Sequence, residues 1–196
     1  MLRPTALDDL VKRWDWRSAS TIWIAASPGD VAVAFEQVSM MELPAASGTR
    51  HRARDGLGGT APRPVPPALT LLADLLDEGY FLLFEEPERE LVLGRVGRFW
   101  RPGASATVAV TGRRAFCDFT QAGYAKAALA LQIQPIAPQL GGGCLVGVES
   151  RVITTDEATR RELSRHQLMG PWATPVGRTE LLRVLRQRAE GGAGDA

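Results

Sequence analysis

Two long segments that each predict a β-strand constrain the fold of this chain more than any other part of its sequence. Apolar side chains occupy every second position from 125 to 133. Side chains of a β-strand point alternately to its two faces, so this period predicts a strand at 124–135. Residues 144–154 predict a second long strand. The turn between them contains proline and three consecutive glycines, which are typical turn residues. The sequence therefore predicts an antiparallel pair of long strands.

The first of these strands also indicates what its faces contact. Its apolar set is expected to face the core: Ala125, Ala127, Leu129, Leu131 and Ile133. Small residues between 125 and 130 leave room beside the sheet. That room suits either a ligand cavity or a helix packed close to the strand, and the sequence leaves both open.

The C-terminal part predicts an arginine-rich helix that two prolines divide. Thr155 or Asp156 can cap its start, and helical composition continues to about residue 189. A proline inside a helix costs about 3 kcal/mol, because it removes a hydrogen bond and clashes with the preceding turn. Pro171 and Pro175 therefore predict two segments, 156–169 and 175–189, that pack across the sheet. A flexible tail is expected at 191–196.

The remaining elements follow from local patterns. Ser27 can cap a helix that begins at Pro28 and ends near Met41. Residues 44–67 are rich in proline, glycine and arginine and predict a long irregular loop. The sequence further predicts helices at 5–13 and 68–77 and strands at 18–25, 80–85, 90–100, 106–111 and 114–119. We treat residues 1–196 as one domain.

Composition limits the partners. The net charge is +1, so no bulk field attracts nucleic acid. No apolar run approaches the roughly 20 residues that cross a bilayer, so membrane insertion is not expected and a cytoplasmic location is the default. Cys117 and Cys144 are too few for a disulfide framework, and His51 and His166 make a poor metal pair. We expect no metal or cofactor.

The element order and residues 23–35 (WIAASPGDVAVAF) resemble the helix-grip proteins, which include START domains, plant pathogenesis-related lipid carriers and polyketide cyclases. Residues 89–100, 123–128 and 149–161 look like an uncharacterised bacterial branch of that superfamily. The resemblance covers residues 18–189 without the 44–67 loop. It implies an α+β fold in which a curved antiparallel sheet wraps around a long C-terminal helix, with an elongated cavity between them.

The resemblance implies one leading function and one alternative. The leading function is binding of an apolar or aromatic small molecule in the cavity between the sheet and the C-terminal helix. The alternative is a cofactor-independent cyclase or dehydratase of polyketide-type biosynthesis. A third interpretation is a partner-binding protein that uses the 44–67 loop. The segment 165–172 departs from related sequences where ligand specificity would be set.

Charged side chains supply the first candidate site residues. Glu149 and Arg151 are two apart on one predicted strand, and Glu90 and Arg98 share a face of another. If these faces coincide, the charges could form an ordinary salt-bridge network or orient a polar group of the ligand. Buried charges should in either case be paired.

The other candidate site residues are chosen because they could transfer protons or stack on a ligand. His166 is a candidate general acid or base, with Tyr124 and Glu149 as further catalytic candidates, although a surface histidine is the simpler interpretation. Trp100 and Trp172 could line a pocket with Arg98 and Arg151, since aromatic rings stack on flat ligands. Core packing is the alternative for both tryptophans.

Overall fold

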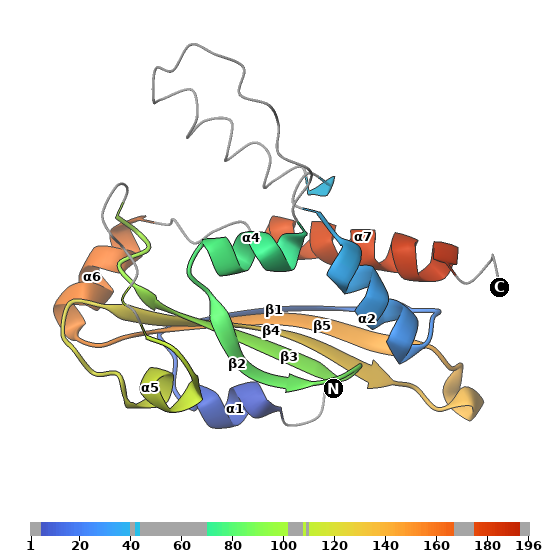
Figure 1. Ribbon diagram of the computed structural model, residues 1–196, viewed down its shortest axis with the longest axis horizontal. Helices are drawn as coiled ribbons and strands as arrows, with labels where there is room; N and C mark the ends of the chain where they lie inside the picture. Colours follow the sequence, from blue (N-terminus) through green and yellow to red (C-terminus); the bar gives the residue numbers. More distant parts are fainter. Residues whose placement is uncertain are drawn as a thin grey trace, which may run out of the picture.

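A computed structural model of the chain describes residues 5–39, 42–43, 70–101, 108, 110–166 and 175–192. Within these ranges, a curved, open, antiparallel sheet of five strands runs in the order β1-β5-β4-β3-β2 (Figure 1). The strands are β1 (Trp16–Ile24), β2 (Phe81–Glu86), β3 (Glu90–Gly97), β4 (Ala125–Pro135) and β5 (Cys144–Thr154). A C-terminal helix packs against this sheet, which confirms the predicted α+β class.

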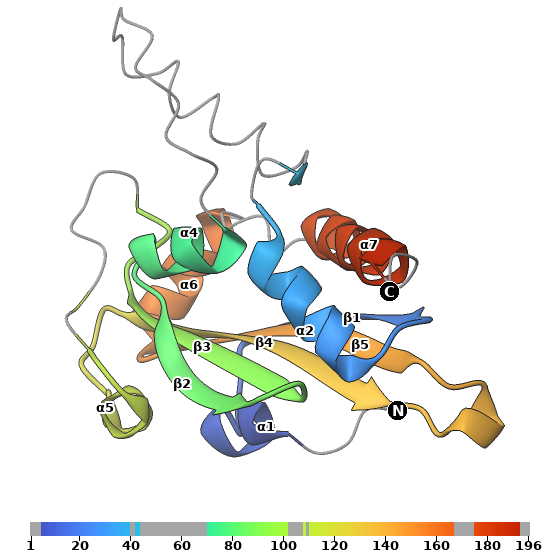
Figure 2. The same ribbon diagram turned by 45° about the vertical axis from the view of Figure 1, so that its right-hand side comes forward.

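Helices cover both faces of the sheet (Figures 1 and 2). The face that we call the upper face carries α2 (Pro28–Gln37), α4 (Leu71–Asp77) and α7 (Pro175–Gly192). The lower face carries α1 (Ala6–Leu10) and α5 (Arg113–Asp118), and α6 (Glu157–His166) lies at one end. No helix in the described ranges is both long and apolar enough to traverse a lipid bilayer.

The strongest prediction, the pair of long strands, is confirmed. β4 and β5 pair antiparallel along their whole length, with Leu131 opposite Val148. The predicted apolar set of β4 faces upward, where Leu129, Leu131 and Ile133 join α2, α4 and α7 in the main core. Gly143 closes the turn at a φ of +72°, and a Cβ there would lie 2.4 Å from the carbonyl oxygen of Ile24. Only glycine fits that close approach.

The predicted break in the C-terminal helix is also present. α6 ends at His166 and α7 begins at Pro175, in the first turn, where proline is tolerated. Asp156, rather than Thr155, caps α6, since its Oδ1 accepts the Thr159 amide at 2.8 Å. The Thr155 hydroxyl instead donates to the carbonyl of Tyr124 at 2.9 Å. Because α7 continues to Gly192, the first two residues of the predicted tail are helical.

Two sequence predictions are wrong in detail. Residues 114–119 were expected to form a strand but belong mostly to helix α5. One helical turn suffices to bury Phe116, whose ring lies 6.2 Å from that of Phe81. The strand predicted to end at Trp100 ends at Gly97, so Arg98 and Trp100 do not share a strand face with Glu90. The 44–67 loop and residues 106, 107 and 109 of the predicted strand 106–111 lie outside the described residues, and the other three residues of that segment are not in a strand.

Candidate functional site

An open groove of about 510 Å³ lies on the upper face between α2, α4 and the β2–β3 hairpin. Its floor is the sheet itself, where Leu91 and Leu93 of β3 meet Leu131 and Ile133 of β4. These residues share a face because Leu91 pairs with Leu131 and side chains alternate along each strand. The volume falls in the range of small-molecule pockets, which is about 300–1,000 Å³.

Each of the two helices that border the groove contributes residues three or four positions apart. Gly29, Ala32, Val33 and Glu36 line it from α2, and Leu72 and Leu76 line it from α4. Such spacing places side chains on one side of a helix. Val33 is 51% exposed, Leu76 48% and Leu82, on β2, 47%. Three large apolar side chains thus remain half exposed around one apolar groove.

The space beneath the adjoining part of α7 is nearly filled. Leu181 of α7 packs against Leu129 and Val148 of the sheet, next to Leu71 and Leu75 of α4, around a void of only about 10 Å³. A void of that size holds about one water molecule. No α7 residue lines the 510 Å³ groove. The groove therefore lies beside α2 and α4, whereas the resemblance places the cavity beneath the C-terminal helix.

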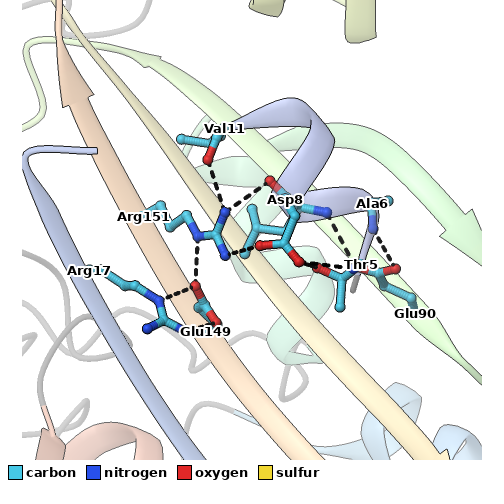
Figure 3. A network of polar contacts seen from close by, with 9 residues as sticks. Thr5, Ala6, Asp8, Val11, Arg17, Glu90, Glu149 and Arg151 are labelled. Atoms are coloured by element: carbon cyan, nitrogen blue, oxygen red, sulfur yellow. Dashed lines mark hydrogen bonds and ion pairs between the residues drawn. The ribbon is translucent and has the colours of Figure 1, made fainter. Parts of the chain in front are cut away.

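Two of the predicted site residues, Glu149 and Arg151, meet on the lower face (Figure 3). The Arg151 Nε donates to Glu149 Oε1 at 2.6 Å, and Arg17 Nε donates to the same oxygen at 2.7 Å. Arg151 also donates to the Asp8 carboxylate and, at 2.9 Å, to the carbonyl of Val11. We call these four charged residues, Asp8, Arg17, Glu149 and Arg151, the α1 clamp, because they bind α1 to the sheet.

Glu90 extends this contact between α1 and the sheet. Val92 and Glu149 both pair with Ala130, and Glu90 lies two residues from Val92, so Glu90 shares the lower face with Glu149. The two strand faces that the sequence left as a condition therefore coincide. Its carboxylate accepts the amide of Ala6 at 2.9 Å. That amide belongs to the first turn of α1 and has no partner within the helix. The expected charge network therefore exists, and it holds a helix.

The electrostatics of the α1 clamp keep its carboxylates ionised. Burial alone would raise the pKa of Glu149, but hydrogen bonds from Arg17 and Arg151 outweigh it and hold that pKa below the ordinary value. For Asp8, burial is likewise outweighed by the hydrogen bond from Arg151, and its pKa is lowered. A carboxylate held in this way is a poor proton donor near neutral pH.

Arg98, Tyr124 and Trp100 lie near the α6 end of the sheet. The Arg98 Nε donates to the carbonyl of Gly123 at 2.8 Å, and its guanidinium stacks 4.5 Å from the Tyr124 ring centre. Trp100 is 1% exposed and packs against Ala125, Ala127 and Leu163. Trp100 therefore packs in a core cluster, although its indole N–H is buried and has no hydrogen-bond partner among the residues that the structure describes. None of these three residues lines the groove.

The other two predicted site residues are described only in part. His166 is the last residue of α6, and its side chain lies outside the described residues. Trp172 lies wholly outside them. Within the described ranges, no group of three or more His, Cys, Asp or Glu side chains is arranged to hold a metal ion.

The sequence did not indicate a role for the groove residues Val33, Leu72, Leu76 and Leu82. A signal was present in α4, where Leu71 and Leu75 are buried while Leu72 and Leu76 form a second apolar stripe beside them. A helix that only covers a core needs one such stripe. Leu82 could not be placed from the sequence, because the β-bulge between Leu82 and Phe84 changes the alternation of β2.

Comparison with known proteins gives low similarities. No protein-family model matches the sequence, and no curated protein matches it. The solved structure of protein MLL2253 from Mesorhizobium loti is 11% identical, with a TM-score of 0.40 over 92% of this chain and 100% of that chain. The di-domain ARO/CYC protein BexL from the BE-7585A biosynthetic pathway is 12% identical, with a TM-score of 0.37 over 89% of this chain and 50% of that chain. Similarity at this level assigns neither protein's activity to this chain.

Proposed function

We propose that this protein binds an apolar or aromatic small molecule in the groove between the sheet and helices α2 and α4. The observation that carries the proposal is the exposure of Val33, Leu76 and Leu82 around an apolar floor, of which all residues but Leu91 are buried. Single exposed apolar residues are ordinary on a protein surface, whereas a group of them around a concave site is typical of binding.

The free energy for binding would come from apolar burial. Each Å² of apolar surface removed from water contributes about 25 cal/mol. The three half-exposed side chains face one space, so a single hydrocarbon or ring system would cover all of them. The floor is already held rigid by the β3–β4 pairing, which lowers the entropy cost of binding.

The catalytic alternative lacks a comparable observation in the described part of the chain. Glu149 lies on the lower face, and its carboxylate is held by Arg17 and Arg151. The sheet separates it from the groove. We therefore assign no reaction.

Native mass spectrometry with a library of apolar and aromatic compounds tests the proposal. The wild-type protein should form one-to-one adducts. The variant Leu82→Gln should lose most of them, because it places an amide at the groove wall. Leu140→Gln is the matched control, since Leu140 is 76% exposed in the Pro138–Leu140 turn, which does not line the groove. No adducts with any compound, or equal loss in both variants, would reject the proposal.

A further inference from the structure

The rim of the groove is acidic although the chain as a whole is not. Its lining includes five glutamates and one arginine, Arg89, while the whole chain has a net charge of +1. The glutamates are Glu36, Glu85, Glu86, Glu88 and Glu90, although the carboxylate of Glu90 lies on the lower face. The groove therefore combines an apolar floor with a concentration of negative charge.

Two of the five carboxylates already have partners. Glu86 lies 3.5 Å from Arg89, so the only basic residue of the lining is associated with an acid. Glu90 accepts the amide of Ala6 on the lower face of the sheet. The other three, Glu36, Glu85 and Glu88, make no hydrogen bond or ion pair with any residue that the structure describes. Their charge is available to a ligand.

These three acids come from two walls of the groove, the β2–β3 hairpin and α2. Glu85 pairs with Leu91, so its side chain leaves the sheet on the same face as the floor. Glu88, at a φ of +58° in the hairpin turn, has its Oε1 3.3 Å from where a Cβ on Gly29 would lie, in the first turn of α2. Glu36 belongs to the last turn of α2, where the helix dipole adds further negative potential.

We propose that the ligand of the groove is cationic: an amphiphile or aromatic amine that places its hydrocarbon body on Leu91, Leu93 and Leu131 and its ammonium group near Glu85 and Glu88. This inference rests on the proposed function and names the class of ligand. An anionic amphiphile, such as a fatty acid, would meet like charges at the same rim. At physiological ionic strength such charges act over about 8 Å, and the groove itself is only of small-molecule size.

Three ten-carbon ligands with different head groups test the inference by isothermal titration calorimetry. Decylamine is protonated near pH 7, decanol is neutral and decanoate is anionic, so hydrocarbon burial is held constant. Decylamine should bind about tenfold more tightly than decanol, and decanoate more weakly than decanol. The advantage of decylamine should shrink in about 0.5 M salt. If none of the three binds, the proposed function fails; if decanol or decanoate binds as tightly as decylamine, the cationic assignment alone fails.

A charge variant locates the effect. Glu85→Gln with Glu88→Gln should weaken decylamine about fivefold and leave decanol unchanged. The control, Asp9→Asn with Asp118→Asn, removes the same net charge from α1 and α5 on the lower face and should change neither ligand. An equal loss of decylamine affinity in both double variants would show that only the net charge of the protein matters, and it would overturn the cationic assignment. A dimer that forms without ligand and dissociates in Leu76→Glu would also overturn it, because a second copy would then fill the groove.

Discussion

The Nε of Arg151 donates a hydrogen bond of 2.6 Å to the Oε1 of Glu149 on the face of the sheet opposite the groove. Arg151 is 3% exposed, and its remaining donors reach the Asp8 side chain and the backbone carbonyls of Leu7 and Val11. The chain thus separates its two notable features. A charged cluster fastens α1 below the sheet, and an apolar groove is left open above it.

Removing Arg151 should detach α1. Arg151→Met is expected to cost about 3–5 kcal/mol of unfolding free energy, because it leaves the buried Glu149 carboxylate with one partner and removes the donor to Leu7 and Val11. Urea denaturation measures the cost, and hydrogen exchange should show faster exchange of amides 6–11. Arg17→Met is the control: the Arg17 side chain is 48% exposed and should cost no more than about 1 kcal/mol. Equal costs would contradict the assigned role of Arg151.

Shortening a groove wall should affect binding more than stability. Leu76 is 48% exposed, so Leu76→Ala should change the unfolding free energy by no more than about 0.5 kcal/mol. It should weaken an apolar ligand about fivefold, since it removes methyl groups that the ligand would cover. Calorimetry and urea denaturation give the two values. An unchanged affinity would show that the ligand does not contact α4.

Acid should destabilise the start of α6. Hydrogen bonds from the Thr159 and Gly123 amides and the Thr159 hydroxyl lower the pKa of Asp156 to about 2, against an ordinary value of 3.8. The depressed folded-state pKa means that the stabilisation is complete above about pH 5 and is lost as the pH falls towards about 2. The thermal midpoint of the wild type should therefore fall over this range more steeply than that of Asp156→Asn. Parallel curves would contradict the role of Asp156.

A side chain at Gly94 should destabilise the fold because Leu83 occupies the space that it needs. A Cβ at Gly94 would lie 2.5 Å from Leu83 Cδ1, and Leu83 is buried. Gly94→Ala should therefore cost about 1–3 kcal/mol through overpacking. In the background of Leu83→Ala the same substitution should cost about 1 kcal/mol less, a coupling that a double-mutant cycle by urea denaturation measures. Strict additivity would mean that the two side chains do not compete for space.

The sequence predicted the parts of this fold that depend on local chemistry. Three such signals act within a few residues of the chain: the alternation of β4, the glycine at 143 and the proline at 175. The strand, the turn and the helix start that they predict are confirmed. The groove depends instead on α2, α4 and the β2–β3 hairpin meeting in space. Nothing near Leu82 or Glu85 in the sequence indicates that Val33 will lie across from them. Glu149 and Arg151 were correctly placed on one face, but only the position of α1 shows that they hold a helix.

Methyl NMR on the protein with an apolar ligand identifies the side chains that the ligand contacts. Resonances of Leu, Val and Ile methyl groups would be followed during titration with decylamine, or with a compound from the library. We expect the methyl groups that line the groove to shift, notably those of Val33, Leu76, Leu82 and Leu91, while those of Leu182 and Leu185 of α7 keep their resonance positions. Shifts confined to α7, or no shift at any methyl group, would contradict it.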